Sequence, residues 1–319
     1  QYPNELLFFR LGDFYELFFD DALVASKELN ITLTGRAGGL EERIPMCGVP
    51  YHAVEGYIAK LIKKGFRIAI CEQVEDPKLA KGIVERKVIK IITPGTALTE
   101  QLLDDNSNRF LAVLLMQDAE TCVVFADVTT GECLWFRASG ENSEEAVFEQ
   151  LYRLQPMELV LVDGEPYAQE YSELIAKRMP KCVVTYVPAE HTTNYFNVHF
   201  GEPQHLSRVV INTVELLLGY VHETVKADLG NINTLTKINK EEFMNLDSAA
   251  IRNLELIKNM RDGSKSATLI DVLDYTATNM GARKLRQWIE CPLLDLTSIL
   301  NRQDAVATLL LDVKVRESL

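Results

Sequence analysis

The sequence lacks the long apolar run, roughly 18 residues, that a membrane-spanning helix needs. Its first ten residues also lack the basic and then apolar layout of a secretory signal peptide. No segment repeats at a fixed period, and none is of low complexity. We therefore expect a cytoplasmic protein with no membrane partner.

Cysteine motifs are missing as well. The six cysteines are scattered, with no CxxC pair and no histidine pair at zinc spacing. This pattern favours reduced thiols, and we expect no metal site. The cysteines are Cys47, Cys71, Cys122, Cys133, Cys182 and Cys291.

A nucleotide-binding loop is also absent. The pattern G-x-x-x-x-G-K-[ST], whose backbone cradles phosphates, occurs nowhere in the sequence. We therefore expect this chain to hold no cofactor and to have no ATPase activity.

An excess of basic charge is the last thing lacking. The net charge is −13, which at first argues against a nucleic-acid partner. Residues 1–100, however, hold 13 Lys and Arg against 14 Asp and Glu, so residues 101–319 carry −12 of the total. Residues 60–90 hold nine basic and four acidic groups. Such a run is most often a solvated face, but if DNA is bound we expect the contact here.

What is present is an ordinary globular composition, 47% apolar and 25% charged, over 319 residues. That length predicts two or three domains. At the N-terminus, residues 5–11 form an apolar run typical of a buried strand. Asp13 then suits a helix N-cap, with Glu16 in capping-box position. The apolar stripe of this expected helix is Phe14, Leu17, Phe18, Ala22, Ala25 and Leu29.

The rest of the first hundred residues favours an α/β or α+β domain. Gly35, Gly38 and Gly39 mark a loop. Residues 53–64 read as a helix, and residues 66–71 and 86–93 as strands.

A polar segment, residues 102–109, indicates a linker to a second α/β domain. Strands are expected at 110–116, 121–127 and 132–137, followed by a helix at 143–154. A strand at 158–162, a helix at 167–179 and a strand at 182–186 come next, and an apolar helix at 205–221 leads out. This alternation predicts a three-layer or RNase H-like plan. Further helices are expected at 246–260, 281–289 and 298–311, the start of an all-α domain.

Several long motifs, in order, resemble the bacterial MutS family of DNA mismatch repair proteins. The resemblance covers the whole chain and is weakest between about residues 135 and 205. The motifs are LLFFRLGDFYELF from Leu6, IPMCGVPYHAV from Ile44, CEQ from Cys71, VERKV from Val84, TPGT from Thr93, RNLEL from Arg252 and MGARKL from Met280.

The resemblance implies three domains. Residues 1–105 would be the mismatch-recognition domain, 106–237 an RNase H-like connector, and 238–319 the beginning of a helical lever domain. The family's DNA clamp, ATPase and dimerisation elements would lie outside this chain, so ATP and Mg²⁺ are implied only for the full-length protein. The implied partners are duplex DNA with mismatches or small loops, a second copy of the full-length protein and a MutL-type repair protein bound by the connector. A cytoplasmic, nucleoid-associated location is implied too.

Phe14 and Glu16 match the Phe-x-Glu motif of the family. The resemblance implies that Phe14 enters the minor groove as a wedge, stacks on a mispaired base and kinks the DNA. Glu16 would hydrogen-bond the base, either as an acceptor or, when protonated, as a donor to a purine acceptor. Spacing alone favours another reading, in which Phe14 is a core residue and Glu16 completes the capping box.

Two arginines are further candidate DNA contacts. Arg36 matches a basic position where the family contacts the DNA backbone, although a solvated loop arginine fits equally well. Arg10 is a weaker candidate. Tyr51 and His52 follow Pro50 at the start of a helix, and we interpret them as packing or capping residues.

Asp127 supports a different function. It ends an expected strand, and RNase H nucleases hold two Mg²⁺ with a carboxylate cluster. No second or third carboxylate is evident at suitable positions, so a turn-starting Asp is the better interpretation. A module that docks repair partners without reading DNA is the other alternative.

Overall fold

The computed structural model describes residues 2–36, 43–75, 85–97, 109–188, 194–203, 205–226, 229–239, 243–244, 246, 248–312, 314 and 316. The chain divides into two compact units. The first comprises residues 1–105 and 109–236, and the second comprises residues 106–108 and 237–319. The linker expected at residues 102–109 lies outside the described residues, except for Arg109.

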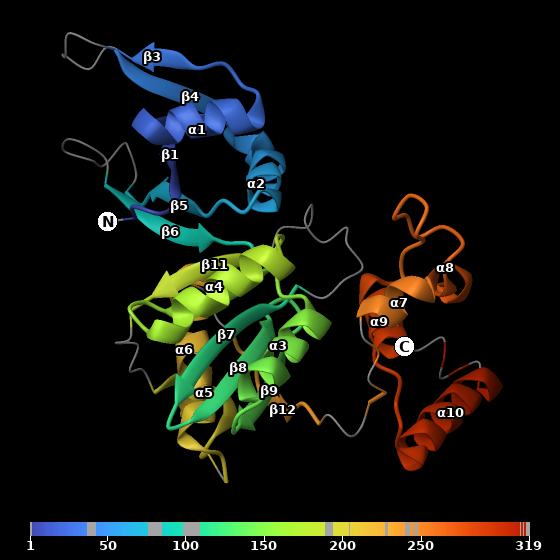
Figure 1. Ribbon diagram of the computed structural model, residues 1–319. Helices are drawn as coiled ribbons and strands as arrows, with labels where there is room; N and C mark the ends of the chain where they lie inside the picture. The colour runs from blue at the N-terminus through green and yellow to red at the C-terminus, as the bar shows by residue number, and fades with distance from the viewer. Residues whose placement is uncertain are drawn as a thin grey trace. The chain divides into compact units, whose positions relative to one another are not determined.

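The first unit begins with a six-stranded sheet in the order β3-β4-β2-β1-β5-β6 (Figure 1). The pair β1 and β5 is parallel, and the other neighbours are antiparallel. The strands are β1 (Leu6–Leu11), β2 (Phe14–Phe18), β3 (Thr34–Arg36), β4 (Ile44–Pro50), β5 (Ile68–Gln73) and β6 (Arg86–Ile92).

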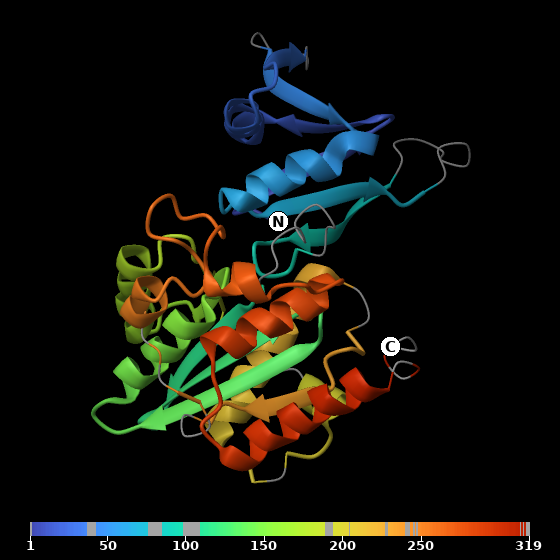
Figure 2. The ribbon, with the colours of Figure 1, turned by 90° about the vertical axis from the view of Figure 1, so that its right-hand side faces the viewer.

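Helices α1 (Phe19–Leu29) and α2 (Val54–Lys63) bury their apolar stripes against one face of this sheet. A short 3₁₀ turn, Tyr51–Ala53, leads into α2, which Figure 2 shows lying along the strands. We call the face that carries the core the inner face and the opposite one the outer face. The inner-face core includes Leu6, Phe8, Tyr15, Leu17, Ala22, Ala25, Leu29, Val49, Ile58, Leu61, Ile62, Ile68 and Ile70.

The helix expected to open at Asp13 begins six residues later, so that prediction was wrong. Residues 14–18 form β2, which pairs with β1 on one side and β4 on the other. Aromatic residues favour a strand here, and Tyr15 and Leu17 are buried at period two. The stripe at Ala22, Ala25 and Leu29 belongs to the helix, but its apparent extension back to Phe14 does not.

The second sheet follows in the same unit, in the order β11-β10-β7-β8-β9-β12. Strands β7, β8 and β9 form an antiparallel meander, and β10 and β11 are added in parallel to β7. This is the expected RNase H-like plan. The strands are β7 (Leu111–Gln117), β8 (Glu120–Asp127), β9 (Glu132–Ser139), β10 (Glu158–Val162), β11 (Val183–Val187) and β12 (Thr234–Lys237).

Helices cover both faces of the second sheet, which explains why β10 is buried throughout. Figures 1 and 2 show α3 and α4 on one side, with α6 on the other. The predicted helix at 143–154 and the predicted strand at 158–162 are confirmed. The helices are α3 (Ser143–Leu154), α4 (Pro166–Arg178), α5 (Tyr195–Phe200) and α6 (Arg208–Val225).

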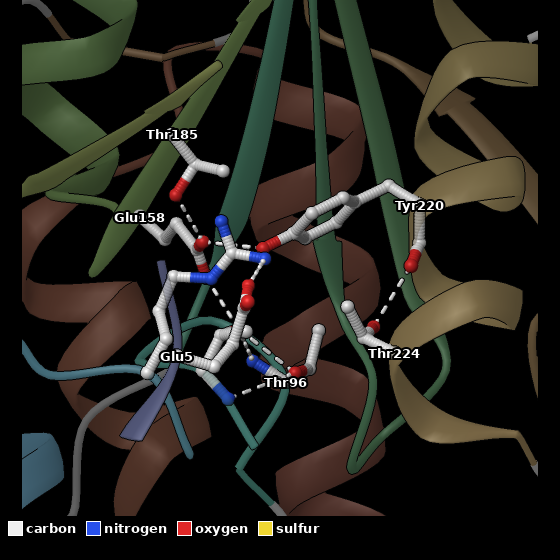
Figure 3. A network of polar contacts seen from close by, with 8 residues as sticks. Glu5, Thr96, Glu158, Thr185, Tyr220 and Thr224 are labelled. Carbon is white, nitrogen blue, oxygen red and sulfur yellow. Dashed lines mark hydrogen bonds and ion pairs between the residues drawn. The ribbon is translucent and has the colours of Figure 1, made fainter. Parts of the chain in front are cut away.

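A buried polar network joins the end of the first sheet to the second. Glu158 at the start of β10 is buried completely, and it accepts four hydrogen bonds from three segments. Thr93 Oγ1 and Gly95 N bond Oε2 at 2.5 and 2.9 Å. Thr185 Oγ1 on β11 and Tyr220 OH on α6 bond Oε1 at 2.6 and 2.5 Å (Figure 3). A fully satisfied buried carboxylate fixes the geometry of the segments around it.

Arg67 extends this network into the first sheet. Its guanidinium forms an ion pair of 2.8 Å with Glu5, just before β1. The same group lies 6.0 Å from the centre of the Tyr220 ring. Burial and the nearby Glu158 raise the pKa of Tyr220 well above its ordinary value, so its hydroxyl stays a donor.

The second unit is helical in its described part. It contains α7 (Ser248–Asn253), α8 (Leu269–Leu273), α9 (Asn279–Glu290) and α10 (Leu296–Leu311). Side chains of Thr268, Thr278 and Asp295 accept the N-terminal amides of α8, α9 and α10. No described helix of the chain is long and apolar enough to span a bilayer.

The helix expected at 246–260 was predicted too long, because α7 ends at Asn253. The backbone at Glu255 has a positive φ of 48°, which does not continue a helix. The Glu255 carboxylate also accepts from the amide of Met260 at 2.7 Å, and the Asn259 side chain accepts from Asp262. Side chains thus take the amides that a longer helix would have used.

Candidate nucleic-acid interface

The candidate site starts at a tight hairpin between β1 and β2. Leu11 pairs with Phe14, so only Gly12 and Asp13 form the loop. Gly12 has a φ of +56°, as two-residue hairpin loops require. Phe14 therefore leaves the loop directly and is the first residue of the second strand.

Strand geometry places Phe14 and Glu16 on the same face. Side chains two apart in a strand point to the same side. Tyr15 and Leu17 fill the inner-face core, so Phe14 and Glu16 lie on the outer face. Phe14 is 47% exposed, which rules out the reading of Phe14 as a buried core residue. In a helix, positions i and i+2 would have faced apart.

The residue opposite Glu16 on the neighbouring strand has no side chain, which leaves space for the side chain of Glu16. It pairs with Gly48 on β4, and a Cβ at Gly48 would lie 3.5 Å from Glu16 Cγ and 3.2 Å from the carbonyl oxygen of Tyr15. On the other side Glu16 pairs with Phe9 of β1, also an outer-face residue. The capping-box role expected for Glu16 does not apply, because no helix begins at Asp13.

Arg36 is brought to Glu16 by the sheet. It ends β3, the edge strand, and its Nη1 lies 3.3 Å from Glu16 Oε2. Gly35 is part of this strand and pairs with Pro45, where the sequence indicated a loop; Gly38 and Gly39 lie outside the described residues. An exposed ion pair of this kind contributes little to stability. The Arg36 guanidinium is thus available to a ligand on the outer face.

Arg10 is placed differently. It pairs with Tyr15 across the hairpin, and so shares the inner face with Tyr15. Its Nε donates to the carbonyl of Gly12 at 2.6 Å, and its guanidinium lies 4.0 Å from the centre of the Tyr51 ring. Contact of Arg10 with DNA stays a prediction.

Several residues of the basic run make contacts within the protein, and contact of this run with DNA stays a prediction. Lys64 pairs with Glu28, and Lys87 pairs with Glu85. Arg86, at the start of β6, lies over the ring of Phe9 on β1, 5.2 Å from its centre. Burial lowers the pKa of Lys90. Lys78 and Lys81 lie outside the described residues.

The alternative site at Asp127 is a turn. Asp127 is completely buried, and its Oδ1 accepts from the amides of Thr129 and Thr130 at 2.9 and 3.3 Å. Its Oδ2 accepts from the amide of Arg109 at 3.3 Å. Among the residues that the structure describes, no group of three or more His, Cys, Asp or Glu side chains could hold a metal ion. The turn-starting interpretation of Asp127 is the one that fits these contacts.

Two features of the structure were not predicted from the sequence. The stacking of Arg10 on Tyr51 follows from the hairpin register, which the predicted helix hid. The network at Glu158 had a signal, since an acidic residue opens the otherwise apolar run ELVLV. Glutamate is almost never fully buried without partners, so that position predicts a buried polar cluster.

Comparisons with known proteins match one family along the chain. The family model "MutS domain I" matches residues 1–101, "MutS domain II" residues 108–233 and "MutS domain III" residues 249–319. A DNA mismatch repair protein MutS from Desulforamulus reducens is 42% identical over all of this chain, which covers 38% of that relative. The MutS of Lachnoclostridium phytofermentans is 43% identical over all of the chain, and here 35% of the relative is covered.

A third relative, the DNA mismatch repair protein MutS of Acetivibrio thermocellus, is 43% identical over 96% of the chain and 36% of its own length. The chain therefore spans little more than a third of these relatives. Three family models in order and full coverage of the chain at about 42% identity settle the relationship. The chain belongs to the MutS family of DNA mismatch repair proteins.

Proposed function

We propose that this chain is the part of a mismatch repair protein that recognises mispaired or unpaired bases in duplex DNA. The observation that carries the proposal is the pair on β2. Phe14 is 47% exposed on the outer face, and Glu16 lies beside it on the same face. The alternating residues Tyr15 and Leu17 are buried on the inner face. Single exposed apolar side chains are common on protein surfaces, so the proposal rests on the exposed ring and the carboxylate sharing one face of the sheet within the Phe-x-Glu motif.

The outer face suits an inserted wedge. A wedge in the minor groove has to offset the unstacking of a base step, a few kcal/mol, and it kinks the duplex. A mismatched step is already poorly stacked and paired, so deforming it costs less. Phe14 can stack on any base for about 1–3 kcal/mol, which lets one side chain serve several mispairs.

The ion pair between Glu16 and Arg36 gives the carboxylate a role beside phosphates. A lone anion at this position would be repelled by DNA. Arg36, 3.3 Å away, offsets that charge and can turn to a phosphate when DNA arrives. Glu16 is then free to bond the exposed edge of the base.

The remaining assignments follow from the family. This chain would supply no catalysis; ATP and Mg²⁺ would be bound by the rest of the complete protein. The complete protein would act as a homodimer, and the connector, residues 106–237, would dock a MutL-type partner. Recognition and docking are compatible, so an adaptor role for the connector does not compete with DNA reading by residues 1–105.

The test replaces Phe14 by alanine in the complete protein and measures affinity for mismatched and matched duplexes at one stated salt concentration. Mismatch affinity should fall roughly tenfold to a hundredfold, with little change for the matched duplex. The matched control is Tyr186→Ala, an aromatic of the connector with 46% exposure, which should leave both affinities unchanged.

Stability separates the wedge from a packing role. Phe14→Ala should leave the melting temperature nearly unchanged, whereas Leu17→Ala, fully buried on the same strand, should cost about 2–5 kcal/mol. Retained mismatch discrimination in the Phe14 variant would rule the proposal out.

A further inference from the structure

Both carbonyls of the hairpin loop before Phe14 are held from outside the loop. The Gly12 carbonyl accepts from Arg10 Nε at 2.6 Å. The Asp13 carbonyl accepts from the backbone amide of Tyr51 at 2.9 Å. Because Phe14 follows directly, these two bonds fix where its backbone stands.

The two donors are themselves held together. The Arg10 guanidinium lies 4.0 Å from the centre of the Tyr51 ring and 5.4 Å from that of Tyr15. A planar guanidinium over aromatic faces gains both stacking and electrostatic attraction. The Tyr15 hydroxyl in turn donates to the carboxylate of Glu72 on β5. Burial and this carboxylate raise the pKa of Tyr15 to about 12, so it remains a neutral donor at physiological pH.

Arg10 lies on the opposite side of the sheet from the wedge. Arg10 and Tyr15 are paired, and Tyr15 is part of the inner-face core. Phe14 and Glu16 point to the outer face. The backbone carbonyl of Arg10 also accepts from Arg86 Nε at 3.4 Å. The Arg10 side chain contacts the carbonyl of Gly12 and the rings of Tyr15 and Tyr51.

We propose that Arg10 is a positioning residue, which clamps the Gly12–Asp13 loop against Tyr51 and thereby presents Phe14 in a fixed place. The inference rests on the proposed function of Phe14 as the inserted residue. A side chain that must enter a base step gains from a support that is rigid before binding, because a loose loop would have to be ordered at that moment. Arg10 acts through the loop and touches no nucleotide.

The test uses the complete protein with Arg10→Lys, which keeps the charge but loses the planar stack and the Nε donor. Tyr51→Leu removes the ring from the other side of the clamp, and Tyr51→Phe keeps the ring as the matched control. In the two clamp variants the ratio of mismatched to matched affinity should fall roughly tenfold, part of what stacking provides. The affinity for the matched duplex should be unchanged in both clamp variants. Tyr51→Phe should keep the parent protein's affinity for both duplexes.

Salt dependence distinguishes positioning from a phosphate contact. Losing one phosphate contact reduces the slope of log affinity against log salt by about one. Arg10→Gln should therefore lose discrimination with an unchanged slope. A slope lower by about one would mean that Arg10 contacts a phosphate, and the inference would be wrong.

A measurement without DNA tests the clamp itself. Hydrogen exchange at the amide of residue 51, the donor to Asp13, should be faster in Arg10→Lys and Arg10→Gln than in the parent protein. Unchanged exchange, or full discrimination in Arg10→Lys, would overturn the inference. If Phe14→Ala also keeps its discrimination, the proposed function fails as well; if Phe14→Ala loses it while Arg10→Lys does not, only the clamp is wrong.

Discussion

The hydroxyl of Tyr220 on α6 donates a 2.5 Å hydrogen bond to Oε1 of Glu158, the first residue of β10. The other oxygen of the same carboxylate accepts hydrogen bonds from the Thr93 hydroxyl and the Gly95 amide, which follow the last strand of the first sheet. In a buried site each of these bonds is strong, and each would be costly to leave unmade. The two sheets thus share one buried carboxyl group.

Glu158→Gln should lower the free energy of unfolding by about 1–3 kcal/mol. The amide oxygen can take the place of Oε2 and keep the bonds from Thr93 and Gly95, but the amide nitrogen then lies where Oε1 accepted two hydrogen bonds. The hydroxyls of Thr185 and Tyr220 must turn from donors to acceptors, and their own protons lose the buried acceptor that the carboxylate gave them. Urea denaturation measures the change.

Glu170→Gln on α4 is the matched control, because Glu170 is exposed. It should stay within about 0.5 kcal/mol of the parent. Equal stability of the Glu158 variant and this control would show that the network contributes nothing to the fold.

Gly131→Ala should destabilise the connector by more than about 1 kcal/mol. Gly131 has a φ of +78°, and an added Cβ would lie 2.2 Å from the carbonyl oxygen of Asn231. Gly140 has a φ of +87° with open space around it. Gly140→Ala therefore measures the backbone strain alone, and the excess loss in Gly131→Ala measures the clash. Similar losses in the two variants would contradict this.

Alkaline pH should destabilise the connector. Burial raises the pKa of the Cys122 and Cys133 thiols from 9.0 to about 12, and that of Tyr167 from 10.0 to about 12. The folded state then holds protons that the unfolded state releases. The stability is fully present below pH 9 and is lost as pH rises from about 9 to about 12. Urea midpoints at a series of pH values measure the loss.

The thiol contribution can be isolated. Cys122→Ala combined with Cys133→Ala removes two of the groups. The slope of the unfolding free energy against pH between 9 and 11 should therefore become shallower, by the amount that corresponds to the release of up to two protons on unfolding. A slope that does not change would mean that these thiols are not the source. The substitution also creates a small cavity, so the slope and not the absolute stability is compared.

Much of this fold could be predicted from the sequence where period and length agree. The helix Ser143–Leu154 and the strand Glu158–Val162 carry strong, uninterrupted patterns, and both were predicted to the residue. Short elements without such a pattern were not found. Among them are α5, six residues long, and β3, whose central residue is Gly35.

The region of the candidate site was the hardest to predict. Asp13, with Glu16 three residues later, fits a helix start, and Phe14, Leu17 and Phe18 fit its stripe. Pairing with β1 and β4 on both sides overrides that local preference, and no local pattern reports it. The consequence is functional, because only the strand places Phe14 and Glu16 on one face.

Asp127→Asn should destabilise the connector without removing any activity. One asparagine oxygen can keep the bonds from Thr129 and Thr130, but the Nδ2 group would face the amide of Arg109 as donor against donor. We expect a loss of about 1–3 kcal/mol in the free energy of unfolding. Asp163→Asn is the matched control, because Asp163 also follows a strand but is exposed. It should leave the free energy of unfolding nearly unchanged.

The same variant tests the alternative nuclease function. Asp127 is buried and both of its oxygens accept backbone amides, so it has no free side toward Mg²⁺ or substrate. We expect no Mg²⁺-dependent cleavage of DNA or of an RNA–DNA hybrid by the parent protein, and the same from Asp127→Asn at a temperature where both are folded. Cleavage by the parent that disappears in Asp127→Asn, with the Asp163→Asn protein still active, would reverse the assignment and make Asp127 catalytic.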